Sequence, residues 1–224
     1  MATPTLLFLP LSAQLDDPET VAWCRGVPLL VAEGLERTGA VQTGFAIWST
    51  GSGTSLRLCH LQGRAADDDV AAYGRAAGAS VALSGLASWQ GDPFLRWDVV
   101  ACDGRGLLRR LTVPTSVGGS RVELVRSAFL AVAEAIGIAG AEPPPSLTRT
   151  ESDDALLGWA RDREAAWSRR RRGLPSEEAS FRWLLSALTC DPGYEPAARE
   201  LLRRAGEALV GAGGSWDSER SWRA

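Results

Sequence analysis

Few residues in this chain have the types and the spacing that catalysis requires. His60 is its only histidine, and no nearby serine or cysteine forms a nucleophile motif with it. Arginine supplies every basic side chain, so a Schiff-base lysine and a P-loop lysine are both excluded. A histidine in an ordinary strand or surface position is the simpler interpretation. The sequence therefore predicts no catalytic residues and a protein that is not an enzyme.

An acidic run offers oxygen ligands, but its spacing favours a helix start over a metal site. Asp67, Asp68 and Asp69 are consecutive, so on a helix their side chains point in different directions. At a helix N-terminus they would supply an N-cap and first-turn charges that suit the helix dipole. We therefore interpret them as the start of a helix.

The cysteines give no sign of a zinc site either. They lie far apart and form no C-x-x-C pair: Cys24, Cys59, Cys102 and Cys190. We expect them to be buried, reduced thiols, as in a reducing compartment. No metal and no cofactor are predicted.

Two glycine-rich segments have the flexibility to cradle a phosphate. They are residues 51–54 and the sequence Gly118, Gly119, Ser120, which precedes a predicted helix. Neither has the P-loop pattern or the full dinucleotide-binding spacing, so ordinary loop geometry is the favoured interpretation. A small-ligand or nucleotide sensor that uses residues 118–120 remains the alternative function.

The strongest charge feature is a run of four arginines at the end of a predicted helix: Arg169, Arg170, Arg171 and Arg172. Such a run complements the helix dipole, and it also suits an acidic protein surface. Nucleic acid is not favoured, because the net charge is −3 and no aromatic stacking motif accompanies the run.

Nine tryptophans against two tyrosines is an unusual composition. Core packing is the simpler role for those within predicted helices, but tryptophan and arginine also dominate interface hot spots. Together with the arginine run we therefore select five tryptophans as candidate protein-binding residues: Trp159, Trp167, Trp183, Trp216 and Trp222.

The elements that must position these residues fall into two parts. In residues 1–140, apolar and alternating patterns predict strands at 5–9, 41–49, 81–86, 95–99 and 107–113. Helices are predicted from Asp67 to a stop at Gly78 and over residues 121–136. Residues 16–19 contain a helix-start signal with Pro18 at the first helical position, and residues 26–28 offer a second start. We favour a main helix that begins near Val27, since Pro28 would be costly deep inside a longer one. The order predicts an α/β domain with a mixed sheet.

The second part is predicted to be a small all-α segment. Residues 141–150 contain three consecutive prolines and are expected to form an extended linker. Residues 151–212 contain three amphipathic helical patterns, and 213–224 are predicted to be a flexible tail. The three helices are too few for a free-standing repeat array, so we expect them to pack on the α/β domain or on a partner.

The two parts together resemble a known arrangement. The opening strand with Pro10, the helix through Leu35 and the helix–glycine–strand segment from Tyr73 to Gly85 resemble the TolB amino-terminal-type α/β domain. Leu184, Ala187 and the turn at 191–194 resemble the start of tetratricopeptide repeats, to which that domain is fused in bacterial regulators and cyclase-associated proteins. The resemblance implies a protein-binding role for the helical segment.

The sequence thus favours a non-catalytic scaffold or adaptor in a bacterial assembly or regulatory complex, with a protein partner that presents an acidic surface. No apolar run approaches the ~18 residues of a membrane span, and no basic residues precede the apolar start. We therefore expect no membrane insertion and a cytoplasmic location. An oligomer is compatible with the sequence.

Overall fold

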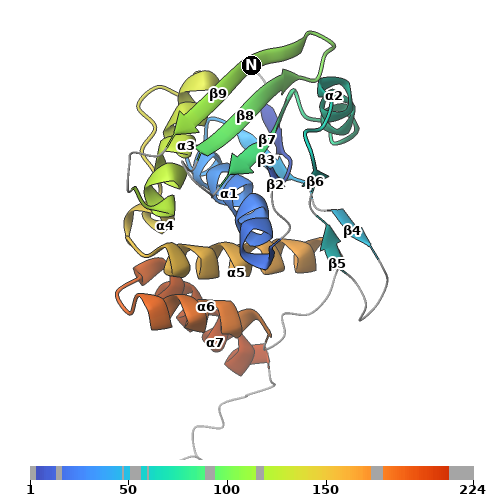
Figure 1. Ribbon diagram of the computed structural model, residues 1–224. Coiled ribbons are helices and arrows are strands. Elements are labelled where there is room, and N and C mark those ends of the chain that lie inside the picture. The colour runs from blue at the N-terminus through green and yellow to red at the C-terminus, as the bar shows by residue number, and fades with distance from the viewer. Residues whose placement is uncertain are drawn as a thin grey trace, which may run out of the picture.

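The computed structural model describes residues 4–13, 17–46, 48–50, 57–59, 61–88, 94–114, 119–172 and 179–211. The architecture is mixed α/β, as the sequence predicts. One sheet carries helices on both faces, and a layer of three helices lies against the helix that covers one of those faces (Figure 1).

Seven strands form the main sheet: β1 (Thr5–Phe8), β2 (Ser12–Ala13), β3 (Gln42–Phe45), β6 (Leu61–Gln62), β7 (Val81–Ser88), β8 (Phe94–Ala101) and β9 (Gly106–Pro114). β1 lies between β3 and β7 and is parallel to both. β8 and β9 follow β7 as an antiparallel meander, and β9 pairs with β8 alone among the described strands. β4 (Trp48–Thr50) and β5 (Arg57–Cys59) form a separate antiparallel pair.

The sheet continues beyond the carboxyl end of β1. β2 pairs with the second half of β7, where Ser12 lies opposite Leu86, and β6 pairs with β2. Leu9 and Leu11, which flank the bend between β1 and β2, are fully buried. In open α/β sheets, nucleotides bind in the crevice at the carboxyl ends of the strands. Here β2 occupies that position beside β7.

Helices cover the two faces of the sheet unequally. α1 (Pro18–Glu36) and α3 (Arg121–Ala135) pack on the face that carries Phe8, Leu83 and Trp97. α2 (Asp67–Ala76) covers the other face through a smaller apolar cluster. Gly78, the predicted helix stop, follows α2 with a φ of 71°, a conformation that glycine adopts without strain.

The start of α1 differs from the prediction, because the helix runs through Pro28 from Pro18. Proline cannot donate to the carbonyl four residues earlier, which leaves the oxygen of Cys24 without its helical partner. The N–H of Leu11 donates to that oxygen at 2.8 Å. The chain between β1 and β2 therefore replaces the missing bond, and Asp17 caps the true start by accepting from the N–H groups of Glu19 and Thr20.

Three further expectations are corrected. The strand expected over 41–49 is interrupted after Phe45, and β4 pairs with β5 instead of the main sheet. The N-cap of α2 is Ala66, which offers no side-chain cap, so the acidic run supplies first-turn charges only. Cys24 and Cys102 are buried thiols, but Cys190 is exposed because it ends a helix at the turn that follows.

The proline-rich segment packs closely where an extended spacer was predicted. It contains a one-turn helix, α4 (Pro145–Thr148), and Leu147 is fully buried. The remaining helices are α5 (Asp153–Arg172), α6 (Ala179–Cys190) and α7 (Glu195–Gly211). Leu147, Trp159 and Tyr194 belong to the same core cluster as the apolar face of α1. α5 packs on α1, α6 packs on α5, and α7 packs on α6. The helical layer thus packs on the α/β part through α5, which is one of the two arrangements expected.

Within the described part of the chain, no helix combines the length and the hydropathy that crossing a bilayer requires.

Candidate protein-interaction site

The helix α5 joins the α/β part to the rest of the helical layer by two close contacts. A Cβ atom on Gly26 of α1 would lie 2.7 Å from the Cβ of Ala160, so the two helices cross almost backbone to backbone. On its other side, a Cβ atom on Gly158 would lie 3.0 Å from the carbonyl oxygen of Trp183 and from the amide nitrogen of Ala187 in α6. Small residues at both crossings fix the position of α5.

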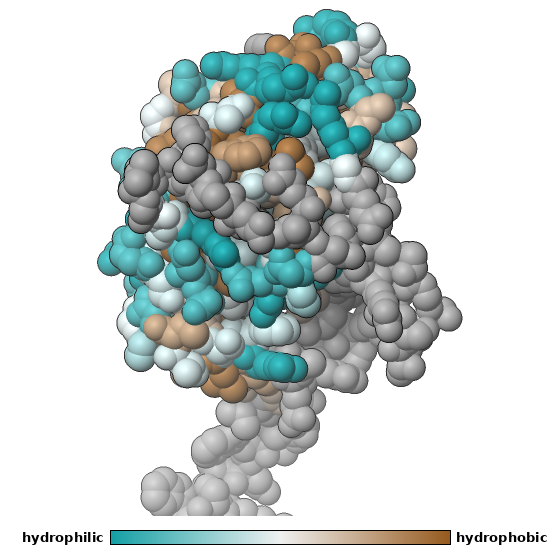
Figure 2. Space-filling model, viewed as in Figure 1, coloured by the Kyte–Doolittle hydropathy of each residue, from teal (hydrophilic) through white to brown (hydrophobic). Residues whose placement is uncertain are grey.

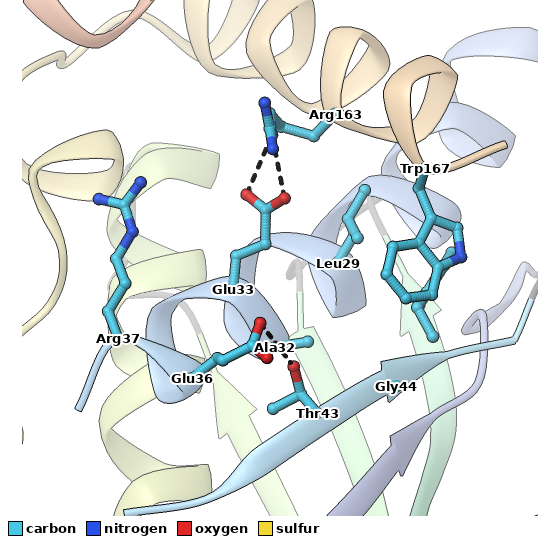
Figure 3. Close-up of a pocket in the computed structure, with 10 residues that line it drawn as sticks. Leu29, Ala32, Glu33, Glu36, Arg37, Thr43, Gly44, Arg163 and Trp167 are labelled. Atoms are coloured by element: carbon cyan, nitrogen blue, oxygen red, sulfur yellow. Dashed lines mark hydrogen bonds and ion pairs between the residues drawn. The ribbon is translucent and has the colours of Figure 1, made fainter. Parts of the chain in front are cut away.

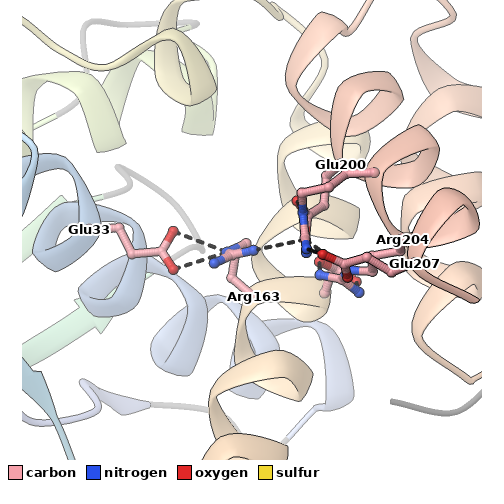
Figure 4. A network of polar contacts seen from close by, with 7 residues as sticks. Glu33, Arg163, Glu200, Arg204 and Glu207 are labelled. Atoms are coloured by element: carbon pink, nitrogen blue, oxygen red, sulfur yellow. Dashed lines mark hydrogen bonds and ion pairs between the residues drawn. The ribbon is translucent and has the colours of Figure 1, made fainter. Parts of the chain in front are cut away.

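A polar network strengthens this position (Figure 4). The Nε of Arg163 lies 2.9 Å and 3.2 Å from the two carboxylate oxygens of Glu33 on α1. Its Nη1 lies 3.5 Å from Glu200 on α7. A single half-buried arginine of α5 therefore contacts acids from the helices on both sides of it.

A buried ion pair also connects α5 to α7. Arg204 donates to both carboxylate oxygens of Asp162 at 2.8 Å and 2.6 Å, and its Nε donates to Glu200 at 2.7 Å. Asp162 is fully buried and Arg204 is nearly so. Such a paired arrangement specifies one docking of α7, because removing either partner would leave an uncompensated buried charge.

Burial and arginine partners shift the pKa values of the acidic groups in this region in opposite directions. Burial opposes ionisation of Glu200, but hydrogen bonds from Arg203 and Arg204 outweigh it and lower the pKa to about 2. Burial dominates at Glu164, where it raises the pKa although the Nε of Arg25 lies 2.5 Å from the carboxylate. Burial likewise raises the pKa of Tyr194, whose hydroxyl donates to the carbonyl oxygen of Ser146 at 2.6 Å.

A pocket of about 280 Å³ lies where α1, β3 and α5 meet (Figure 3). Trp167 forms one wall and packs edge to face with Phe45, their ring centroids 6.5 Å apart. Glu33 turns toward Arg163, and Glu36 lies 3.5 Å from the hydroxyl of Thr43. The pocket combines an aromatic wall with two carboxylates, one engaged by Arg163 and the other by the hydroxyl of Thr43.

The helical layer exposes two large apolar side chains, one on α6 and one on α7. Leu185 of α6 is 52% exposed and Leu202 of α7 is 73% exposed. In Figure 2, hydrophobic side chains lie among hydrophilic ones over this lower layer. Trp183 of α6 lies beneath the guanidinium groups of Arg161 and Arg182, which are 4.8 Å and 5.1 Å from its ring centroid.

The structure separates the predicted tryptophans. Trp159 is buried against Tyr194 and belongs to the core, which is the simpler of its two predicted roles. Trp167 and Trp183 are partly exposed and line surfaces of the helical layer. Trp216 and Trp222 lie outside the described residues.

The arginine run occupies the last turn of α5, as predicted. The backbone of residues 169–172 is helical, and their side chains are not among those described. The role of the run in binding stays a prediction.

The contacts at the start of α3, after residues 118–120, do not favour a nucleotide site. The hydroxyl of Ser120 caps α3 by accepting from the N–H of Glu123, and the carboxylate of Asp153 accepts from the N–H of Val122 at 3.0 Å. Two donors that a phosphate would need are therefore already bonded, and one of them is bonded to an anion. Gly118 and residues 51–54 lie outside the described residues.

No three histidine, cysteine or acidic side chains gather in a metal-binding arrangement within the described part of the chain. His60 is not among those residues.

Sequence reasoning missed the network around Arg163. The run Arg161–Asp162–Arg163–Glu164 does contain a signal, because four consecutive charges in an otherwise apolar helical pattern must face more than one neighbour. Their partners Glu33 and Arg204 lie far away in sequence, so spacing alone could not identify them.

Comparison with known proteins identifies distant structural likenesses only. No protein-family model and no curated protein matches the chain. Among solved structures, it is similar to the PelC dodecamer from Paraburkholderia phytofirmans at 11% identity and a TM-score of 0.38, over 63% of this chain and 92% of that one. It is also similar to TolB from Acinetobacter baumannii at 15% identity and a TM-score of 0.39, over 61% of this chain and 29% of TolB. TolB, which the sequence resembles, is thus among the similar structures.

Proposed function

We propose that this protein is a non-catalytic scaffold or adaptor of a bacterial assembly or regulatory complex in the cytoplasm, and that helices α5 to α7 present a preformed surface to a partner protein. The observation that carries the proposal is the pair of exposed leucines, Leu185 on α6 and Leu202 on α7. Close backbone contact at Gly158 holds α6 against α5, and the buried Arg204–Asp162 ion pair holds α7. Rigid helices lose little conformational entropy when a partner binds.

The tetratricopeptide-like interpretation supports the same conclusion. Helical repeats bury their apolar faces against neighbouring repeats, and a short array ends in a face without a neighbour. α5, α6 and α7 pack in sequence order, and the close approach of α5 to α6 at Gly158 is typical of such helix pairs. A partner helix stacked on α6 and α7 would cover the two leucines.

The experiment compares the double variant L185S/L202S with a matched control, L108S/L130S. Leu108 and Leu130 are each 45% exposed but lie on β9 and α3, outside helices α5 to α7. We expect wild type and the control to retain the same partner in affinity capture from the native host, and L185S/L202S to lose it. Light scattering after size exclusion shows whether the partner is a second copy. Equal recovery by all three proteins contradicts the proposal.

The arginine run is tested separately. Replacing Arg169, Arg170, Arg171 and Arg172 by alanine removes four charges that would attract an acidic surface. We expect weaker capture of the same partner and a smaller dependence of capture on salt. Unchanged capture at every salt concentration removes the run from the proposed surface.

A further inference from the structure

A second cavity, of about 390 Å³, lies where the ends of α1 and α4 meet α7. We name it the junction cleft, and we define it by Arg37, Arg149, Trp159, Glu195, Arg199 and Arg203, which line it. Its wall at α4 is firmly held, because Arg126 of α3 donates to the carbonyl oxygens of Leu147 at 2.5 Å and of Thr150 at 2.8 Å. The cleft is therefore preformed.

The charges in the junction cleft do not balance. Arg199 pairs with Glu195, and Arg203 pairs with Glu200 and with Glu207. Arg37 and Arg149 are exposed, and the guanidinium of neither forms an ion pair or hydrogen bond within the part of the chain that the structure describes. The end of α1 supplies only about half a negative charge near Arg37, and the single turn of α4 supplies less.

A buried tryptophan lines the same cleft. Trp159 is 4% exposed, and its indole Nε1 has no hydrogen-bond acceptor among the described atoms. Pro145 and Pro196 complete an apolar lining beside the ring. The cleft thus joins an apolar base to a cationic rim.

Arg37 has a central position at this surface. It lines the junction cleft, the α1–β3–α5 pocket and a third cavity beside residues 138–145. In Figure 3 its side chain stands apart from Glu33 and Glu36, which are engaged elsewhere. A ligand bound at Arg37 can therefore extend along the boundary between the α/β part and the helical layer.

We propose that the junction cleft binds an acidic segment of a partner protein, with Arg37 and Arg149 contacting its carboxylates and an apolar side chain lying against the tryptophan base. This inference rests on the proposed adaptor function and names the partner's chemistry. Arginine recognises carboxylates by paired hydrogen bonds. A nucleic acid would need an extended basic track, whereas Glu195, Glu200 and Glu207 interrupt the positive charge here and the chain carries −3 overall.

The direct test measures fluorescence anisotropy of a labelled synthetic peptide in which Asp and Glu flank a single Leu. The protein variants are R37E/R149E and the control R105E/R109E, which changes net charge equally at exposed positions of β9 and the turn before it. We expect wild type and control to bind the peptide. The affinity of R37E/R149E for it should be lower by about tenfold or more. Binding should also weaken as salt rises.

The neutral variant R37Q/R149Q guards against misfolding, because glutamate at the end of α1 opposes the helix dipole. It should show the same loss of peptide binding with an unchanged melting temperature. The proposal is overturned if wild type does not bind the peptide at low salt, or if both charge-reversed proteins lose binding equally. It is also overturned if a single-stranded oligonucleotide binds the cleft more tightly than the peptide.

The outcome is distinguishable from that of the adaptor proposal. If L185S/L202S loses its partner while R37E/R149E keeps both partner and peptide, the helical face binds proteins and the junction cleft does not. If none of the variants changes partner capture, the adaptor proposal itself fails.

Discussion

Arg163 shows how one side chain can connect three helices. It lies between Glu33 of α1 and Glu200 of α7, is 16% exposed, and extends from the helix between them. Because both acids are partly withdrawn from solvent, each depends on a cationic partner. The helical layer therefore owes part of its orientation to a contact that is polar and directional.

Replacing Arg163 by alanine should lower the free energy of unfolding by about 2 kcal/mol, since two partly buried carboxylates lose a charged hydrogen-bond donor. The matched control is R199A, whose guanidinium is 79% exposed and pairs with Glu195 one turn away. That change should cost about 0.5 kcal/mol or less. Urea denaturation measures both values, and equal losses would contradict the ranking.

Protonation of Glu200 should destabilise the folded protein at low pH. Its pKa is about 2 in the folded chain against an ordinary 4.5, so its contribution is complete above about pH 4.5 and is lost as pH falls toward 2. Allowing for its partial exposure, the loss is about 1–2 kcal/mol. The variant E200Q should lack this dependence, whereas E207Q, at a more exposed position of the same helix, should keep it. Unfolding measured across that pH range in all three proteins decides the matter.

At the residue scale, the sequence identified side chains more reliably than it identified their partners. The tryptophan at 159 was predicted to be either core or contact, and burial against Tyr194 places it in the core. Asp162 and Arg204 are 42 residues apart, and no local pattern relates them. Cys190 was expected to be buried like Cys24, but position at a helix end decides exposure more than residue type.

At the element scale, α1 is the clearest case of tertiary structure overriding local preference. A proline ten residues inside a helix ordinarily argues for a boundary, and here the N–H of Leu11 takes over the carbonyl that Pro28 leaves free. The helix through 121–136 and the stop at Gly78 were predictable because periodicity, capping and glycine all agree there. The linker was not, since its prolines concealed a buried Leu147.

The variant P28A tests this account of α1. Replacing an interior helical proline by alanine ordinarily stabilises a helix by about 3 kcal/mol. Here the new N–H would have to share the oxygen of Cys24 with Leu11, so we expect a change within about 1 kcal/mol of zero. Chemical denaturation measures it, and a gain near the full value would show that the Leu11 bond does not compensate.

At the scale of the whole molecule, the two parts predicted from composition share one core. Apolar side chains of α4, α5, α6 and α7 belong to the cluster built on α1 and α3. Three helices are too few for a free-standing repeat array, and this was the reason to expect that they pack on the α/β part or on a partner. Which surface remains free could not be predicted, because it depends on how α5 lies across α1.

That crossing gives a prediction about docking. G26A would normally gain helix propensity, but its methyl group would lie 2.7 Å from Ala160, so we expect a loss of about 1–2 kcal/mol. A160G alone should cost about 1 kcal/mol. The double variant G26A/A160G should lose less free energy of unfolding than the two single variants lose together, because the glycine moves to the other helix and the methyl groups no longer collide. Strict additivity in a double-mutant cycle would mean that the helices do not meet at these residues.

The outer edge of β9 has a consequence for how this protein behaves at high concentration. β9 is nine residues long and has no described neighbour on one side. A strand of another copy can pair with this free edge, and repeated pairing would produce an aggregate. Leu107 and Leu108 add exposed apolar area to that strand, while the exposed Arg109 beside them makes two copies repel each other when they align. The next residue, Arg110, is engaged by the buried Asp98 at 2.6 Å. Arg109 therefore has the position of a gatekeeper against aggregation, and neutralising it should lower the solubility of the folded protein.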